Sequence, residues 1–373
     1  MDLVQLTTKM AAEKMFSGED FNGQQTKDQS YGNDIKHVLN VFQRVGLIFA
    51  AAFLACIVLY HAAFSLQVFS GGFAFSPVKP NLSSSASLEA ESKLENVLLK
   101  ASMPHKTVIL TTLNEAWAAP NSVFDLFLES FRIGNGTLKL LDHVVVITMD
   151  DKAYNRCIAI HPHCYSLTTN DTDFSGEAGF QTQVYLKMMW RRIEFLGTII
   201  DLGYNFIFTD TDIMWFRNPF PRFHSNADFQ IACDFFRGNP SDIKRNLPNG
   251  GFTYVKSNKQ TSKFYKFWYK SREKYPGLHD QDVLNKIKQD PYIHKIGLRI
   301  KFLDTVYFGG FCEPSKDLNK VCTMHANCCV GLSKKVYDLN IILGDWQNYL
   351  SAVRNDTRKL SNSSPWNVPN HCK

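Results

Sequence analysis

Two aspartates one residue apart, Asp210 and Asp212, are the residues whose types and spacing point most directly to chemistry. They follow the apolar run Phe206 to Phe208, which is typical of a buried strand. Side chains two apart on extended backbone point the same way, so both carboxylates would face one point beyond the strand. Paired carboxylates suit a divalent cation, which can in turn hold a phosphate group. Asp-x-Asp at a strand end is also ordinary turn chemistry, so the surrounding chain must decide between the two interpretations.

The segments before the pair predict the sheet that would position it. Thr107 to Leu113 and His143 to Thr148 are strand-like, and Val123 to Phe131 between them is helix-like. This order is a βαβ unit, which predicts an α/β fold with a mostly parallel sheet flanked by helices. Phe180 to Leu202 is predicted as an amphipathic helix that ends at Gly203. Its buried stripe comprises Tyr185, Met189, Ile193, Leu196 and Ile200. The aspartates would then lie at the carboxyl end of a central strand, where open α/β sheets bind ligands.

Three later runs are predicted as strands: Ala227 to Cys233, Pro248 to Lys256 and Phe302 to Phe308. The second of them contains Gly250 and Gly251. These glycines either serve backbone geometry alone or let the main chain approach a ligand closely.

Two helices are predicted in the second half of the chain. The first runs from Thr261 to Arg272, with Thr261 as its N-cap. The second opens at His279, so that Asp280 and Gln281 lie in its first turn. Acidic residues are favoured there by the helix dipole alone, so this position does not by itself indicate a site.

An uncharged stretch from Val45 to about Phe64 is predicted to cross a membrane, because about 20 apolar residues are enough for one span. A buried core helix or a cleaved signal peptide fits less well, since the stretch starts late and no clear cleavage pattern follows. Lys27, Lys36 and Arg44 precede it, whereas only Lys79 follows closely. This asymmetry predicts a cytosolic N-terminus and a lumenal C-terminal region.

Glycosylation sequons and cysteines agree with a lumenal location. All the sequons follow the span: Asn81, Asn135, Asn170, Asn355 and Asn362. Of nine cysteines, Cys56 lies in the span and the other eight favour disulfides, although their pairing cannot be deduced. A zinc site at Cys312 to Cys329 is the competing interpretation. His325 in this segment is either a structural histidine or a metal ligand.

Charge and composition bound the remaining possibilities. The formal net charge of +6 is modest for 373 residues, and no dense Lys/Arg stripe indicates nucleic acid binding. The predicted organisation is a cytosolic tail (1–44), a transmembrane signal anchor (45–64), a lumenal stem (65–104), a folded domain (105–350) and a polar C-terminal tail (351–373).

Five motifs carry a family resemblance across roughly residues 105–350. They are T-T-L-N at Thr111, F-T-D-T-D-I-M-W-F at Phe208, P-N-G-G-F-T-Y-V-K at Pro248, H-D-Q-D-V-L-N at His279 and T-M-H-A-N-C-C at Thr323. In this order they resemble the plant nucleotide-diphospho-sugar transferases of glycosyltransferase family 77. The resemblance implies a GT-A fold, Mn2+ or Mg2+, and a nucleoside-diphosphate-sugar donor that is expected to be UDP-linked and to carry a pentose or related sugar. It also implies a type II Golgi membrane protein that acts on a cell-wall polysaccharide or glycoprotein acceptor.

The same resemblance assigns site residues. The implied metal ligands are Asp210, Asp212 and His325. The implied donor-binding residues are Thr111, Asn114, Lys187, Asn249, Gly250 and Gly251. Asp280 and Gln281 would lie near the anomeric carbon as the catalytic pair. Retention of configuration is implied, and a front-face reaction, in which the leaving phosphate helps to deprotonate the acceptor, needs no covalent nucleophile.

Two other classes of protein remain open at this point. A haloacid-dehalogenase-type phosphatase also places D-x-D after an apolar strand. Its pair usually opens the domain and is followed by Thr or Val, whereas this pair lies deep in the domain and is followed by Ile213. A catalytically silent sugar-nucleotide-binding or scaffold protein would keep the same ligands without turnover.

Overall fold

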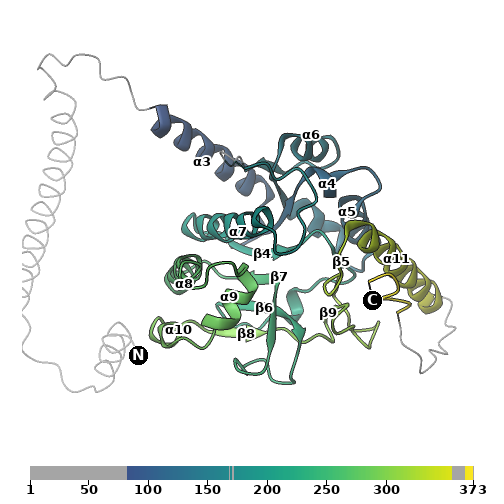
Figure 1. Ribbon diagram of the computed structural model, residues 1–373. Coiled ribbons are helices and arrows are strands. Elements are labelled where there is room, and N and C mark those ends of the chain that lie inside the picture. The colour runs from purple at the N-terminus through teal and green to yellow at the C-terminus, as the bar shows by residue number, and fades with distance from the viewer. Residues whose placement is uncertain (1–81, 168, 170–171, 355–365, 373) are drawn as a thin grey trace, which may run out of the picture. The chain divides into compact units, whose positions relative to one another are not determined.

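The computed structural model describes residues 82–167, 169, 172–354 and 366–372 (Figure 1). The predicted span from Val45 to Phe64 and the tail before it lie outside the described residues. Within the described ranges, no helix combines the length and the apolar character that a membrane crossing requires.

A mixed seven-stranded sheet forms the centre of the described chain. Its strands are β1 (Thr107–Leu113), β2 (Val144–Thr148), β3 (Cys164–Ser166), β4 (Asn205–Thr209), β6 (Phe229–Phe235), β7 (Leu247–Val255) and β8 (Ile300–Phe302). Their order is β3-β2-β1-β4-β7-β6-β8, with β1 to β4 mutually parallel. The predicted mostly parallel sheet is therefore confirmed, because β6 and β8 run in the same direction and, within this described sheet, only β7 is reversed, antiparallel to both β4 and β6. The reason is that β6 and β7 follow each other without a crossover helix, which a parallel pair would need.

Strand β4 lies in the middle of the sheet, as its apolar sequence predicts. Ile207 pairs with Ile109 of β1 on one side and with Tyr254 of β7 on the other. The pairing with β7 continues past the end of β4, because the Asp210 N–H donates to the Gly251 carbonyl at 2.7 Å. The first aspartate of the pair is thereby fixed to the neighbouring strand.

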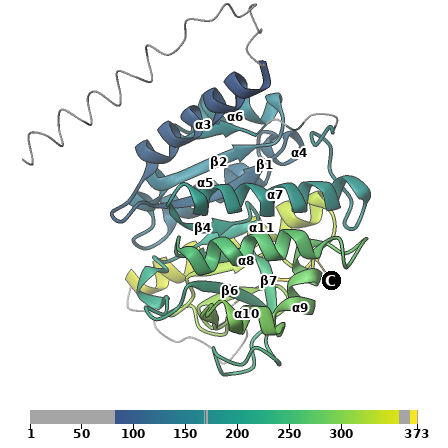
Figure 2. The same ribbon diagram turned by 90° about the vertical axis from the view of Figure 1, so that its left-hand side faces the viewer.

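Helices cover both faces of the sheet (Figures 1 and 2). The described helices are α3 (Leu82–Ala101), α4 (Glu115–Ala118), α5 (Val123–Ile133), α6 (Asp151–Ile160), α7 (Gln183–Asp201), α8 (Lys259–Ser271), α9 (Asp280–Ile287), α10 (Pro291–Lys295) and α11 (Leu332–Arg354), with 3-10 turns at Leu138–His143 and Phe220–Arg222. Alternate β1 residues face opposite ways: Val108 joins the core beneath α3, α7, α8 and α9, and Ile109 joins the core beneath α5, α6 and α11. Figure 2 shows α7 and α8 side by side in front of the sheet.

The helix starts are set by capping residues. Asn258 caps α8 and forms a capping box with Thr261, so the predicted cap at Thr261 is wrong and lies inside the first turn of the helix. His279 caps α9, and its side chain accepts the Gln281 N–H. The predicted first turn of α9 is therefore confirmed.

A small second sheet brings a late segment of the chain to the aspartate pair. It consists of β5 (Ile213–Trp215), β9 (Phe308–Gly310) and β10 (Thr323–His325) in the order β5-β10-β9. His325 of β10 pairs with Ile213 of β5, directly after Asp212. The predicted strand from Phe302 to Phe308 is wrong, because a turn at Asp304 separates β8 from β9, and the two belong to different sheets.

Disulfides are present, as the cysteine count predicts. They join Cys157 to Cys164, Cys312 to Cys328 and Cys329 to Cys372. In the described chain, Cys233 and Cys322 are free and buried. The zinc alternative at Cys312 to Cys329 is wrong, because three of the four cysteines in that segment are already paired.

Residues 366–372 pack on the domain, although the sequence predicts a polar tail. Trp366 is buried and its ring stacks on Phe216. Asp338 and Asp345 of α11 accept backbone hydrogen bonds from Cys372 and Asn367, respectively. The carboxylates of α11 satisfy the polar backbone of this segment, which explains how it can lie against an apolar core.

Candidate active site

Asp210 and Asp212 follow β4 in a tight turn. The Ile213 N–H donates to the Asp210 carbonyl at 3.2 Å, so the carboxylates converge across this turn and not along extended backbone as predicted. The Asp212 side chain is 2% exposed and that of Asp210 is 26% exposed. The position after a central strand is confirmed, and the metal interpretation now depends on what surrounds the two groups.

Asp210, Asp212 and His325 form a group whose ligand atoms all lie within 4.8 Å of one another. His325 Nε2 lies 3.2 Å from Asp212 Oδ1, yet that buried oxygen receives no hydrogen bond of good geometry. A Cβ on Gly251 would lie 2.6 Å from His325 Cε1 and 2.7 Å from Asp210 Oδ2. The absence of a side chain at Gly251 keeps the group open, and two carboxylates with an imidazole fit a divalent cation.

Lys335 of α11 also contacts this group. Its ammonium donates to Asp212 Oδ2 at 2.5 Å and to the Ala326 carbonyl at 2.7 Å. Burial alone would raise the pKa of Asp212, but Lys335 and His325 hold that pKa below its ordinary value. Asp212 is therefore ionised and ready to bind a cation.

Arg192 of α7 links the group of Asp210, Asp212 and His325, called the metal group below, to α9. Its Nη1 lies 2.9 Å from Asp210 Oδ1, and its Nη2 lies 2.6 Å from Asp280 Oδ2. Burial opposes ionisation of Asp280, but Arg192 and His279 hold the pKa of its carboxyl at about 2. Burial also raises the pKa of Asp210, and Arg192 opposes that rise. One buried guanidinium thus favours the ionised form of two carboxylates.

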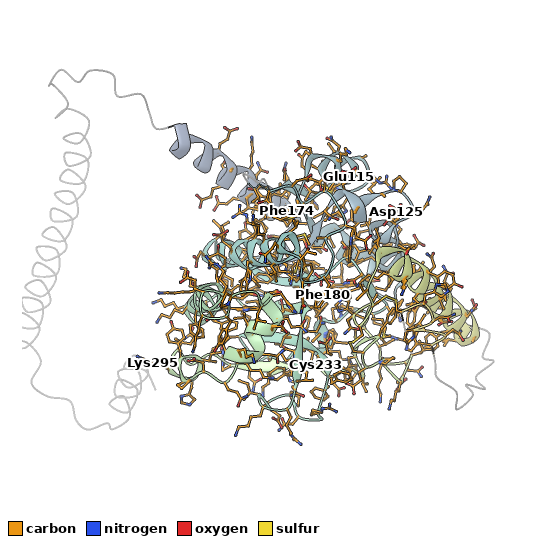
Figure 3. The ribbon with its side chains drawn as sticks, in the orientation of Figure 1. Glu115, Asp125, Phe174, Phe180, Cys233 and Lys295 are labelled. Atoms are coloured by element: carbon orange, nitrogen blue, oxygen red, sulfur yellow. A yellow bond between two sulfur atoms is a disulfide. The ribbon has the colours of Figure 1, made fainter. Side chains whose placement is uncertain are left out.

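Asp234, at the end of β6, gathers amide side chains. Its Oδ1 accepts hydrogen bonds from Asn249 Nδ2 and Asn327 Nδ2, and its Oδ2 accepts one from Gln281 Nε2, all at 2.8 Å. Cys233, the preceding residue, is labelled in Figure 3.

These groups line one cavity of about 480 Å³. The predicted site residues that it brings together are Asn114, Asp210, Asp212, Asn249, Gly250, Gly251, Asp280, Gln281 and His325. Asn114 also caps α4 through the Trp117 N–H and donates to the carbonyls of Phe174 and Gly176. Phe174 is labelled in Figure 3. Asn114 therefore holds the cavity wall as well as lining it.

Two predicted donor-binding residues lie elsewhere. Thr111 is fully buried within β1, and its successors Thr112 and Leu113 line the cavity instead. Lys187 lines a separate recess of about 400 Å³ on another face of α7. Five residues correspond to about 500° of helical rotation, so the face that carries Lys187 cannot also be the face that carries Arg192.

Sequence reasoning missed Arg192, Asp234 and Asn327. Arg192 had a usable signal, because it lies three residues after Met189 and four before Leu196, on the predicted buried stripe. A charged residue in that position needs a buried partner. Asp234 directly follows a predicted strand, but its partners come from three distant segments, which no local pattern reveals.

Comparison with known proteins identifies the family. Residues 139–339 match the family model described as nucleotide-diphospho-sugar transferase. The chain belongs to this family. The resemblance that the five motifs carry is thereby confirmed, and the domain is that of a glycosyltransferase.

The transferase has relatives in Arabidopsis thaliana. It is 54% identical over 281 residues to an uncharacterized protein, covering 75% of this chain and 73% of the relative. It is 23% identical to UDP-D-xylose:L-fucose alpha-1,3-D-xylosyltransferase 3, covering 56% of this chain and 60% of that protein. Among solved structures, mouse xyloside xylosyltransferase 1 in its apo form matches with a TM-score of 0.36 and 14% identity, over 60% of this chain and 98% of that one.

Proposed function

We propose that this protein transfers a pentose or related sugar from a UDP-linked donor to a cell-wall polysaccharide or glycoprotein acceptor, with the help of Mn2+ or Mg2+. The observation that carries the proposal is the Asp210, Asp212 and His325 group, which opens into a 480 Å³ cavity in a domain of this family. The relatives that are UDP-D-xylose-dependent xylosyltransferases support a UDP-pentose donor.

The residues of the cavity divide the work of holding such a donor. A divalent cation on the three ligands would bridge the diphosphate and stabilise charge on the leaving group. Lys335 supplies a second positive charge beside Asp212. Asp280, which Arg192 keeps ionised, offers an acceptor for sugar hydroxyl groups.

We propose retention of configuration by a front-face reaction. Asp280 Oδ2 is bound to the Arg192 guanidinium, and Asp280 Oδ1 lies 3.5 Å from His279 Nδ1. A carboxylate paired with a buried guanidinium suits binding better than nucleophilic attack, because attack would require it to leave that cation. The leaving phosphate would instead help to deprotonate the acceptor hydroxyl.

We also propose a type II topology in the Golgi membrane, with Val45 to Phe64 as the anchor and the domain in the lumen. The three disulfides support an oxidising compartment. The charge asymmetry around the apolar stretch supports the orientation.

Incubation of the full-length protein with a panel of nucleotide sugars and Mn2+ tests the activity. We expect UDP release, fastest with a UDP-pentose, and none in Asp212→Asn. Asp151→Asn, at an exposed position of α6, is the matched control and should behave like the wild type. Metal-dependent donor binding without UDP release would favour the silent binding protein, and phosphate release from simple phosphomonoesters would favour the phosphatase.

Two neighbouring glycines test the metal site separately from activity. Gly251→Ala should weaken Mn2+ binding in calorimetry by about tenfold or more, because its methyl group would press on Asp210 and His325. A Cβ on Gly250 makes only ordinary contacts, the nearest at 3.6 Å, so Gly250→Ala should bind Mn2+ normally. Equal Mn2+ affinity in the two variants would contradict the assigned ligands.

A further inference from the structure

We propose that Asp234 is a positioning residue for sugar transfer: its carboxylate fixes the amide groups of Asn249 and Gln281 so that they present N–H donors to the bound substrate. This inference rests on the proposed function, because it concerns the same cavity. No motif in the sequence points to Asp234, and its role follows from the hydrogen bonds around it.

The Asp234 carboxylate accepts hydrogen bonds from three primary amides at once. Asn249 and Asn327 share its Oδ1, and Gln281 bonds to its Oδ2. The amides come from β7, from the segment after β10 and from α9. Only an ionised carboxylate offers enough acceptor sites with no donor of its own.

The amide oxygens of Gln281 and Asn249 are also fixed. Gln281 Oε1 accepts the Gly250 N–H at 2.9 Å, and Asn249 Oδ1 accepts the Gly251 N–H at 2.9 Å. Each amide therefore has its nitrogen toward Asp234 and its oxygen toward the β7 backbone. Reversing either amide would place two donors face to face, so the network permits one orientation.

This orientation leaves a second N–H group on each of the two amide nitrogens. A primary amide nitrogen carries two N–H groups, and Asp234 takes one from each of these side chains. Asn249 and Gln281 both line the cavity that holds the metal group. The remaining N–H groups are donors that suit sugar hydroxyl or phosphate oxygens, and Asp234 determines where they point.

A swap of functional groups tests the network. In Asp234→Asn, an NH2 group replaces the Oδ2 that faces Gln281, so two donors meet. In Gln281→Glu, two carboxylates meet. In the double variant D234N/Q281E, the amide introduced at position 234 donates to the carboxylate introduced at position 281. That carboxylate still accepts the Gly250 N–H, and the net charge equals that of the wild type.

We expect D234N to have opposite effects on kcat in the wild-type and Q281E backgrounds. D234N should lower kcat by about 10- to 100-fold in the wild-type background. In the Q281E background, which already lacks the Gln281 N–H groups, D234N should still raise kcat and donor affinity, because it removes the contact between two carboxylates and lets residue 234 fix the Asn249 amide again. The matched control D234N/N285D has the same charge, but Asn285 bonds to the α9 backbone and Lys288, so it should stay as slow as D234N. Mn2+ affinity should be unchanged in all variants, because Asp234 is not a ligand.

Failure of this inference is distinguishable from failure of the proposed function. If the wild type releases no UDP from any donor, the proposed function fails, and the donor-affinity cycle still tests Asp234. If D234N lowers kcat and donor affinity by similar factors in both backgrounds, the positioning role is overturned. If the double variant recovers only the melting temperature, the network is structural and the proposal is equally overturned.

Discussion

Replacing Arg192 with methionine should damage stability and activity by different routes, and the structure allows both to be estimated. The substitution keeps the aliphatic stem and removes the guanidinium, whose central carbon lies 4.8 Å from the centre of the Phe208 ring. The Arg192 side chain is 6% exposed and is the shared cation of Asp210 and Asp280. Methionine at this position would leave the Asp210 and Asp280 carboxylates without their shared cation.

The cost follows from that loss. Removing one partner of a buried ion pair costs about 3–5 kcal/mol, because the remaining charge stays desolvated. Asp280 is 2% exposed and cannot recover the loss by hydration. Asp210 belongs to the metal group, so saturating Mn2+ should offset part of the deficit. For kcat, loss of a preorganised charge in the site should cost about 10²- to 10³-fold.

Urea denaturation with and without Mn2+, together with donor turnover, measures these effects. Arg191→Met is the matched control, since this neighbouring arginine pairs with Glu194 near the surface and should cost less than about 1 kcal/mol. Adding Asp280→Asn to Arg192→Met should recover stability, because the stranded carboxylate is gone, but should not recover turnover.

Two outcomes would refute this reasoning. One is an Arg192→Met variant no less stable than Arg191→Met. The other is an Asp280→Asn change that lowers stability further in the methionine background. Either would mean that the guanidinium does not stabilise the Asp210 and Asp280 carboxylates as proposed.

Three further predictions concern other contacts. Lys335→Met should raise Mn2+ affinity in calorimetry, because the ammonium competes with metal for Asp212, and should raise the donor KM; lower Mn2+ affinity would contradict this. His325→Ala should weaken Mn2+ binding, and unchanged affinity would leave it a structural role. Arg299 holds the pKa of Asp228 low, so Asp228→Asn should cost about 1–2 kcal/mol at pH 7. That deficit in urea denaturation should vanish as pH falls through this lowered pKa, and a pH-independent deficit would exclude the ion pair as its cause.

Buried apolar runs made the sheet half of the fold predictable. The predicted strand from Thr107 to Leu113 coincides with β1. Its apolar run is continuous because Val108 and Leu110 contact one core, and Ile109 and Leu113 contact the other. The run from Phe302 to Phe308 failed, since apolar content does not reveal that Asp304 turns the chain between two sheets. The mostly parallel sheet was predicted correctly, but which strand is reversed was not, because direction depends on how strands connect.

The candidate site was predictable where its residues lie close together in the sequence. Asp210 and Asp212 lie two residues apart, so no tertiary information is needed to place them together. His325 reaches them only through the pairing of β10 with β5, so its local sequence left it as either a structural histidine or a ligand, and the family resemblance favoured the ligand. Lys187 shows the limit, because choosing a residue on α7 requires the helix rotation, and Arg192 occupies the face that meets the cavity.

The disulfides described above bear on how the protein should be prepared. Cys312, Cys328 and Cys329 line the cavity of the candidate active site, and their bonds tie that wall to the segment after β9 and to the segment at Cys372. A reducing expression host, or a thiol reductant in the assay buffer, would untie the wall that carries His325 and Asn327, whereas in the central sheet it would release only the edge strand β3 from α6. Such a preparation would look folded by circular dichroism and still bind metal and donor poorly, so inactivity measured under reducing conditions would not count against the enzyme.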